Sequence, residues 1–437
     1  MSVPRLGLLG AGAVLALAAC GPAPSDPARQ LGPNPYLPEQ HEYLMPPMAL
    51  SKPGGWAPEQ TPTVAPGLRI QALATGLKNP RRILVLPNGD LLVAEPQPPD
   101  PPHPKRPKDF VMNWVEAKTH PPGKAPNDIV LLRDANGDGV PETKTVFLKG
   151  LNAPFGMALV GGDLYVADTD GVLRFPYTTG ETQVTAPGVM LTDLPQGPID
   201  HHWTKDLTAS PDGSKLYAGV GSNSNITENG IGAEKDRAAI WEIDRASGAH
   251  RLFATGLRNP NGLTFEPSTG VLWAVINERD ELGPDLVPDY MTSVKDGGFY
   301  GWPYSYWGQH VDPRVKPQRP DLVAKATVPD YGLSSHVAPL GMVFSNTATA
   351  LPPAWRSGAF VGEHGSWNRK QFNGYKVVYV PFANGRPAGK PVDVVTGFIG
   401  KDGKAHGRPV GVAIDAHGGL LIADDIGGTV WRVTAAQ

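Results

Sequence analysis

Histidine, arginine and asparagine side chains stand just before short apolar runs of this 437-residue chain, and they are the groups best suited to chemistry. His201 and His202 precede one such run, and Arg258 with Asn259 precedes another. A neutral imidazole can accept a proton from a hydroxyl near pH 7. Cations, amides and imidazoles together favour an anionic, planar or hydroxyl-rich ligand. These residues therefore predict a pocket for such a ligand.

The histidine pair has more than one interpretation. Adjacent residues entering a strand point to opposite sides, so we expect only one of the two to face the pocket. Histidines spaced HxH or HxxxH chelate metal better than an adjacent pair, and a packing or surface role stays open. The chain has no GxSxG nucleophile elbow and no GxGxxG at a strand-to-helix turn. A serine hydrolase and a nicotinamide dehydrogenase are therefore disfavoured.

The segment Asp134–Glu142 carries acidic and amide side chains at the spacing of a calcium loop through its first nine positions. The twelfth position, where a bidentate glutamate is expected, is Thr145. An Asn-Gly/Asp-Gly turn between strands at 129–133 and 143–148 accounts for the same residues. Both a hairpin turn and a weak structural calcium site remain as interpretations.

The elements that must position these histidine, arginine and asparagine residues are β-hairpins. Thr255–Glu281 reads as a polar lead-in, a short strand, a Pro/Gly turn, a β-branched and aromatic strand and a charged exit. Six such hairpins, roughly 60 residues apart, predict an all-β fold, a six-bladed β-propeller. The other five are Thr75–Glu95, Lys149–Asp168, His201–Asn223, His336–Gly365 and Gly407–Asp425.

In a propeller the first strands of all blades surround one channel, so the lead-in residues converge on one end of it. We call this end the mouth. The segment His364–Lys370 should form a loop near it, and the aromatic segment Gly298–Tyr304 should line a seam between blades or a pocket wall. The predicted lead-in residues are Lys78, Asn79, Arg81, Arg82, Asn152, His201, His202, Arg258, Asn259, His336, His406 and Arg408.

Composition limits the class of protein. The 52 glycines and 48 prolines fit many turns rather than long helices. The net charge of -3 predicts no nucleic-acid partner, because binding to phosphates needs a basic face. Propellers run large as single domains, so we expect one domain.

The N-terminus has the composition of an export signal. Arg5 precedes the apolar run Leu6–Ala19, and the small residues before Cys20 match a bacterial lipoprotein cleavage box. Cys20 is the only cysteine, so no disulfide is expected and the thiol stands where a lipid would be attached. An ordinary signal peptide that contains a cysteine is the alternative.

We therefore expect residues 1–20 to be a lipoprotein signal peptide, 21–66 a Pro-rich flexible tether and 67–437 the propeller domain. No transmembrane span is expected after the signal. This organisation predicts a periplasmic protein, lipid-anchored to a membrane of the bacterial cell envelope.

The motifs TGLRNPNGLTF, NERDELGPDLVPD, GGFYGWP, HHWTKDLTASPDG and GRPVGVAIDAHGGLLIADD occur together. In combination they resemble the soluble aldose dehydrogenases that depend on pyrroloquinoline quinone (PQQ), and especially their sorbosone-dehydrogenase-like relatives. The resemblance runs from about Thr75 to Val433. It implies a six-bladed propeller, a PQQ cofactor with calcium, a sugar substrate and an external electron acceptor.

The resemblance also implies roles for particular residues. His202 matches the histidine that abstracts the proton, and His201 stands where relatives usually have an aspartate. Arg258 and Asn259 match an Arg-Asn pair that contacts the quinone, and Arg258 would stabilise negative charge there. Arg408 matches an arginine that holds cofactor carboxylates, with His406 where many relatives have a second arginine.

Two further parts of the family pattern differ in this chain. A cofactor-binding lysine of the fifth blade has no clear match, and Arg369 or Lys370 would replace it. Calcium is bound in relatives largely by cofactor oxygens and main-chain carbonyls after the fourth hairpin. The matching residues are Asp280 and Glu281, whose carboxylates would add ligands.

The sequence thus predicts a dehydrogenase that oxidises an aldose or a sorbosone-like sugar aldehyde by hydride transfer to PQQ. Two alternatives stay open. One is a calcium-dependent propeller lactonase, which would need side-chain metal ligands on the propeller axis. The other is a propeller that binds a ligand without catalysis, because fold does not fix function.

Overall fold

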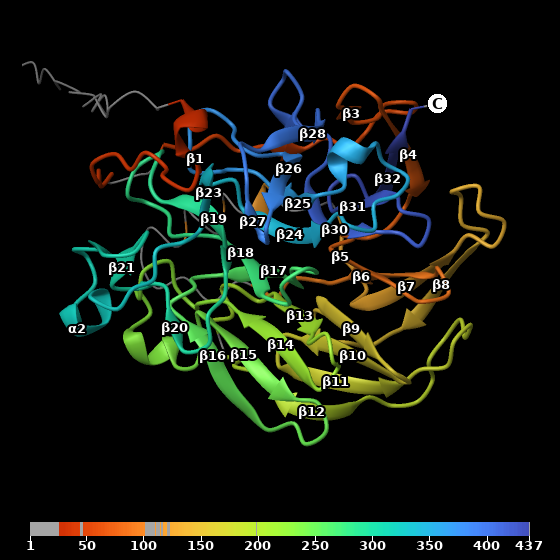
Figure 1. The fold of residues 1–437 in the computed structure, drawn as a ribbon, viewed down its shortest axis with the longest axis horizontal. Helices are drawn as coiled ribbons and strands as arrows, with labels where there is room; N and C mark the ends of the chain where they lie inside the picture. Colours follow the sequence, from red (N-terminus) through yellow and green to blue (C-terminus); the bar gives the residue numbers. More distant parts are fainter. Residues whose placement is uncertain are drawn as a thin grey trace, which may run out of the picture.

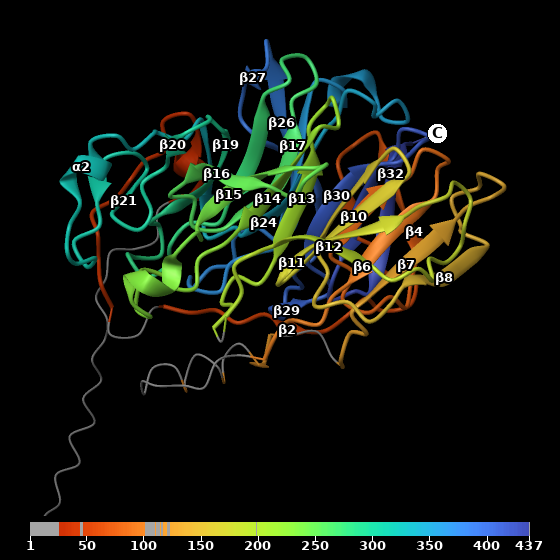
Figure 2. The ribbon, with the colours of Figure 1, turned by 90° about the horizontal axis from the view of Figure 1, so that it is seen from below.

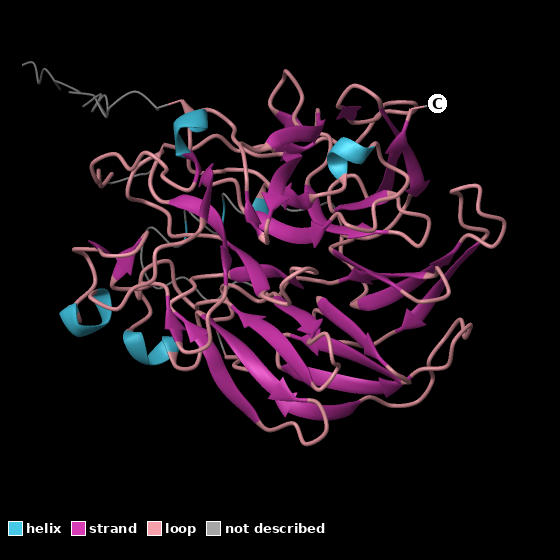
Figure 3. Ribbon diagram, in the orientation of Figure 1, coloured by secondary structure: helices cyan, strands magenta, loops and turns pink. Residues whose placement is uncertain are grey.

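The computed structural model describes residues 26–43, 47–100, 110, 114, 117–119, 123–197 and 199–436. Cys20 and the predicted signal peptide lie outside them. Strands dominate, and the helical elements named below are single turns (Figure 3). No described helix is long and apolar enough to cross a membrane. The short helical elements are η1 (Pro27–Gln30), η2 (Ile231–Glu234), α2 (Pro320–Val323) and η3 (Pro353–Trp355).

Six antiparallel sheets are arranged around a centre, which confirms the predicted six-bladed propeller (Figure 1). The first blade comprises β5 (Arg82–Val85), β6 (Leu91–Glu95), β7 (Asp128–Arg133) and β8 (Thr143–Leu148). The second comprises β9 (Gly156–Val160), β10 (Asp163–Asp168), β11 (Gly171–Pro176) and β12 (Val189–Asp193). The third comprises β13 (Lys205–Ala209), β14 (Lys215–Val220), β15 (Ala239–Asp244) and β16 (His250–Thr255).

The other three blades follow in chain order. The fourth comprises β17 (Pro260–Phe265), β18 (Leu272–Ile276), β19 (Pro288–Ser293) and β23 (Tyr331–Ser335). The fifth comprises β24 (Pro339–Phe344), β25 (Gly358–Glu363), β26 (Lys376–Ala383) and β28 (Val392–Thr396). The sixth comprises β30 (Pro409–Ile414), β31 (Leu420–Asp424), β32 (Thr429–Ala435) and β4 (Leu68–Ala74). The shorter strands are β20 (Gly298–Phe299), β21 (Ser305–Tyr306), β22 (His310–Val311), β27 (Arg386–Pro387) and β29 (Lys404–Ala405).

The six predicted hairpins are the first two strands of the six blades. The inner strands β5, β9, β13, β17, β24 and β30 contact one another in a closed ring. Strand β4, which precedes the first blade in the sequence, forms the outer edge of the sixth blade, because it pairs antiparallel with β32 from Val430↔Ala74 to Ala435↔Leu68. Glycines allow neighbouring inner strands to approach closely: a Cβ on Gly341 would overlap the Val410 carbonyl.

Hydrophobic clusters fill the spaces between neighbouring blades. One cluster joins Leu92 and Leu131 of the first blade to Met157 and Leu164 of the second. Another joins the third and fourth blades and contains Tyr300, which is fully buried. The aromatic segment around Gly298–Tyr304 therefore contributes to a packed seam, one of the two roles predicted for it.

The expected flexible tether is wrong for the described residues before position 67. They form an extended arm, residues 26–43 and 47–66, that packs along one side of the propeller (Figure 2). Gln30 is fully buried and its amide donates to the Asp285 carbonyl. Such native contacts offset the conformational entropy that the segment loses when it is ordered. Strands of two residues attach it to three sheets: β1 (Leu31–Gly32) pairs with β23, β2 (Lys52–Pro53) with β29, and β3 (Thr63–Val64) with β28.

Candidate active site

A recurring carboxylate holds the lead-in segments in three blades. Each carboxylate ends the second strand of its hairpin and accepts the backbone N–H of a lead-in residue. Glu95 accepts from Lys78 at 2.6 Å, Asp168 from Asn152 at 2.8 Å, and Asp424 from Arg408 at 2.9 Å. Burial raises the pKa of Asp168 to about 7 and that of Asp424 to about 6. In these three blades, the charged residue at the end of the hairpin therefore holds the lead-in segment in place at the mouth.

The floor of the mouth is apolar. Phe155, Leu340 and Val410 are buried together, and Trp203 packs against them. The guanidinium carbon of Arg81 lies 5.7 Å from the centroid of the Trp203 ring. An aromatic and aliphatic surface with a cation beside it suits a planar anionic ligand.

His202 has the geometry of a proton acceptor. Its Nδ1 lies 2.8 Å from the Ser222 carbonyl oxygen and 3.0 Å from the Ser222 hydroxyl. A carbonyl can only accept, so the neutral ring carries its proton on Nδ1 and leaves the Nε2 lone pair free. Desolvation, followed by the charges of Arg258 and His201, holds the pKa of His202 well below its ordinary value. The imidazole is therefore neutral at pH 7.

Arg258 is 3% exposed and fixed by main-chain carbonyls. It donates to Glu278 O at 2.7 Å and to Asn225 O at 3.3 Å. Its Nη2 also lies 3.3 Å from Oδ2 of Asp280. These contacts hold the guanidinium near His202, whose pKa it lowers.

Asp280 joins three predicted mouth segments. Its carboxylate contacts Arg258, lies 3.3 Å from Nδ1 of His336, and accepts the side-chain amide of Asn368 at 2.8 Å. Although burial would raise it, His336 and the charge of Arg258 hold the pKa of Asp280 below its ordinary value. These partners already contact the Asp280 carboxylate, and its predicted role as a calcium ligand stays a prediction.

Asn259 lies beside His202 and is 5% exposed. Its Oδ1 is buried and has no hydrogen-bond partner among the described residues. A Cβ placed on Gly221 would lie 2.5 Å from this oxygen and would overlap Cβ of His202. An unpaired buried amide oxygen is costly without a ligand or water, so its position fits a binding site.

A second charged cluster lies on the sixth and first blades. Asp425, 1% exposed, accepts from Nη1 of Arg81 at 2.7 Å and from Nε of Arg408 at 3.2 Å. Nε2 of His364 lies 2.8 Å from the same carboxylate. Although burial would raise it, Arg408 and His364 hold the pKa of Asp425 far below its usual range. Burial and Arg408 lower the pKa of His364 to about 4.

The sequence missed the roles of His364 and Asp425 and gave Arg81 no role beyond a place at the mouth. Asp425 could be anticipated in part, because four of the six predicted hairpins, this one included, end on a charged residue. Its three partners come from the first, fifth and sixth blades, and nothing in a single sequence indicates that these side chains contact one carboxylate.

Three predicted cofactor residues lie outside these clusters. Nδ1 of His406 is 3.1 Å from the Gly55 carbonyl of the arm. Arg369 is buried and lies 3.0 Å from Asp285. Lys370 is exposed. Their cofactor-binding roles stay predictions.

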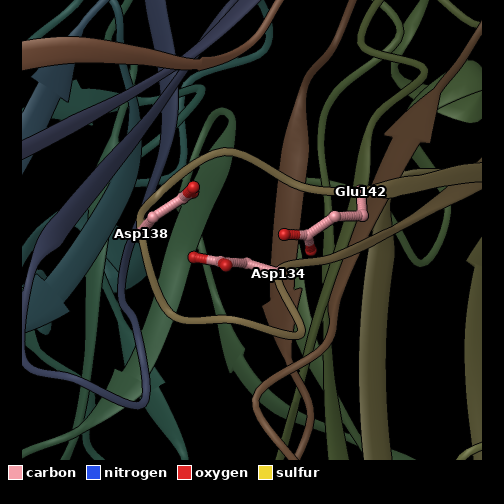
Figure 4. Close-up of side chains that lie close together, drawn as sticks. All are labelled: Asp134, Asp138 and Glu142. Carbon is pink, nitrogen blue, oxygen red and sulfur yellow. The ribbon is translucent and has the colours of Figure 1, made fainter.

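The predicted metal residues differ in their surroundings. Glu281 Oε2 lies 3.9 Å from Arg314. In the β7–β8 hairpin, carboxylate oxygens of Asp134, Asp138 and Glu142 lie within 4.8 Å of one another and point into one loop (Figure 4). The described residues hold no other group of three His, Cys, Asp or Glu side chains with this geometry. The hairpin is confirmed, and calcium binding there stays a prediction.

A cavity of about 350 Å³ lies at the opposite end of the channel. All six inner strands line it, largely with apolar side chains such as Val85, Met157 and Met342. Its one charged lining residue is Arg82, so the prediction that Arg82 lies at the mouth is wrong; its guanidinium lies 3.2 Å from the buried carboxylate of Asp206. The chemistry-bearing groups are therefore at the mouth and not at this end.

Two family models match the chain. The glucose/sorbosone dehydrogenase model matches residues 163–366, and the TrAA12-like model matches residues 316–436. The first match contains His201, His202, Arg258 and Asn259, and the second contains Arg408.

Curated relatives match over part of their length. An uncharacterized protein of Borreliella burgdorferi is 28% identical over 242 residues, 55% of this chain and 62% of that protein. The aldose sugar dehydrogenase YliI of Escherichia coli is 28% identical over 120 residues, 27% of this chain and 30% of that protein. The PQQ-dependent pyranose dehydrogenase of Coprinopsis cinerea is 24% identical over 376 residues, 76% of this chain and 46% of that protein. The chain thus covers less than two thirds of each of these relatives.

Solved structures share the fold. The holo pyranose dehydrogenase PQQ domain of Coprinopsis cinerea superposes with a TM-score of 0.69 at 22% identity, covering 88% of this chain and 100% of that chain. The calcium structure of a Trichoderma reesei family AA12 enzyme gives 0.68 at 20% identity, covering 89% and 98%. The PQQ-bound aldose sugar dehydrogenase of Streptomyces coelicolor gives 0.56 at 16% identity, covering 86% and 100%.

The solved structures share the six-bladed propeller fold of this chain, and the family models match its middle and C-terminal parts. The resemblance to the glucose/sorbosone dehydrogenases, predicted from the hairpin motifs, is confirmed by the family match and these neighbours.

Proposed function

We propose that this protein is a PQQ-dependent dehydrogenase that oxidises an aldose or a sorbosone-like sugar aldehyde at the mouth of the propeller. The observation that carries the proposal is the pairing of a neutral His202, whose Nε2 is free, with Arg258 and the unpaired Oδ1 of Asn259. An external acceptor would take the electrons onward.

The mouth fits PQQ by its donors. Arg258 and Asn259 would contact one side of the cofactor, while Arg81 and Arg408 would hold its carboxylates on the other side. These three guanidinium groups face two carboxylates, Asp280 and Asp425, so an anionic ligand completes the charge balance. When bound, PQQ supplies a carbonyl system that accepts a hydride.

The chain's own residues handle the proton and the orientation of the sugar. Nε2 of His202 accepts the proton of the sugar hydroxyl, and the Ser222 carbonyl holds the ring in the productive tautomer. The guanidinium of Arg258 stabilises negative charge that develops nearby. Trp203 and its apolar neighbours exclude water from the floor.

The decisive experiment is oxidation of a panel of aldoses, sorbosone and simple aldehydes with a dye acceptor, with and without added PQQ and calcium. We expect turnover to require PQQ and to fall about 10²- to 10⁴-fold in His202→Ala, because the proton acceptor is lost. His417→Ala, at an exposed position in the β30–β31 turn, is the matched control and should retain turnover.

Absence of turnover together with no rise in Tm on adding PQQ and calcium would refute the dehydrogenase. A lactonase would hydrolyse lactones with calcium alone, and a binding propeller would show ligand-dependent Tm shifts without turnover. The described mouth gathers no side-chain metal cluster of the kind a lactonase needs.

We also propose that Cys20 carries a lipid that anchors the protein in the periplasm. The support is the cleavage box and the absence of any other cysteine in the chain. Cys20→Ser should shift the protein from the membrane fraction to the soluble fraction after cell lysis. Unchanged membrane association of the variant would contradict the anchor.

A further inference from the structure

The N-terminal arm contacts each of the three loops that carry the mouth residues of the fourth, fifth and sixth blades. The backbone N–H of His41 donates to the Leu282 carbonyl at 2.9 Å, next to Asp280. The N–H of Ala49 donates to the Trp367 carbonyl at 3.1 Å, next to Asn368. These contacts make the arm part of the wall around the mouth.

The third contact is made by a side chain. Trp56 Nε1 donates to Oδ2 of Asp424 at 2.7 Å, and Trp431 Nε1 of the sixth blade donates to the same oxygen at 3.0 Å. The other oxygen of that carboxylate accepts the backbone N–H groups of Arg408 at 2.9 Å and Gly427 at 2.8 Å. Asp424 is fully buried, so losing any of these donors would destabilise its carboxylate in the folded protein. Trp56 thereby helps to fix the backbone from which Arg408 and Asp425 project.

Packing around Trp56 is close. Its ring lies 5.4 Å from the His406 ring at an interplanar angle of 32°, and 5.6 Å from the Phe398 ring. A Cβ on Gly427 would lie 2.6 Å from Trp56 Nε1. The indole therefore occupies a defined place between the arm and the sixth blade. Asp424, the carboxylate that holds the lead-in segment of this blade, thus accepts one of its hydrogen bonds from a residue outside the six repeats.

We propose that Trp56 is a positioning residue for the cofactor site, and that the arm acts through it to hold Arg408 and Asp425 in the geometry that binds the cofactor carboxylates. This inference rests on the proposed function. It concerns a segment that the sequence repeat does not include and that lies outside both family matches.

The test is PQQ binding by Trp56→Phe, which keeps an aromatic ring but removes the N–H donor. Equilibrium dialysis of the full-length protein with PQQ and calcium should give a Kd raised about threefold or more, since a hydrogen bond to a buried carboxylate is lost. Trp355→Phe is the matched control. Trp355 is also half-buried and packs on an aromatic ring, Tyr379, on the fifth blade. We expect its Kd to stay at the wild-type value.

Hydrogen exchange of the apoprotein supplies a readout that does not depend on the cofactor. The amides of Arg408 and Gly427, which donate to Asp424, should exchange faster in Trp56→Phe than in Trp355→Phe. Equal exchange and an unchanged Kd in Trp56→Phe would overturn the positioning role. A wild-type protein that binds no PQQ would instead overturn the proposed function itself.

Discussion

His202 and Asp425 show how single residues acquire function from their surroundings. His202 has the geometry of a proton acceptor because Nδ1 is held by the Ser222 carbonyl, which leaves the lone pair on Nε2. The sequence predicted this residue together with Arg258, Asn259 and Arg408, since all four occupy the same place in the repeat. It did not predict that His406 turns to the arm, because the Gly55 carbonyl that holds it comes from a segment without periodicity.

At this scale we predict that Asp425→Asn lowers the free energy of unfolding by about 3–5 kcal/mol, because Arg81 and Arg408 lose their buried counter-charge. The carboxylates of PQQ would restore that charge, so PQQ should raise the Tm of the variant more than that of the wild type. Asp415→Asn breaks the Arg432 ion pair in a different cluster and serves as the control. Equal PQQ-dependent shifts in Asp425→Asn and wild type would contradict the assignment.

The strands were predictable as elements because each hairpin alternates apolar runs with Pro/Gly turns, and the structure places all six where the repeat puts them. The arm was not predictable, since its strands are two residues long and pair with distant sheets. Its composition favours disorder, and only contacts such as that of Gln30 with the Asp285 carbonyl show otherwise.

Strand β25 ends on a residue that should make stability depend on pH. Glu363 is 2% exposed, its Oε2 has no hydrogen-bond partner among the described residues, and burial raises its pKa to about 8. Between about pH 4.5 and pH 8 the folded state keeps this proton and the unfolded state does not, so the contribution to stability falls as pH rises.

Glu363→Gln should therefore flatten the pH dependence of Tm over that window and raise Tm at pH 8 by a few degrees. Glu266→Gln is the opposite case. Ser268 and Thr269 donate to the Glu266 carboxylate, and despite burial these bonds lower its pKa, so its replacement should reduce Tm. A fall in the Tm of Glu363→Gln at pH 8 would contradict the argument.

At the scale of the whole molecule, the sixth blade combines strands from the two ends of the propeller domain. Strand β4 (Leu68–Ala74) pairs with β32 near the C-terminus, so the sixth blade is completed by a strand that precedes the first blade in the sequence. The repeat predicted the number of blades but not this closure, because β4 has no hairpin partner next to it in the sequence.

Along the propeller axis, the mouth and the cavity at the other end are separated. Phe155, Leu340, Val410 and Trp203 pack together at the mouth, and Arg82, paired with Asp206, lines the cavity at the other end. For the proposed dehydrogenase, sugar and electron acceptor must then use the same opening in turn. The reaction should divide into two half-reactions, with parallel lines in double-reciprocal plots and inhibition when the sugar occupies the reduced enzyme.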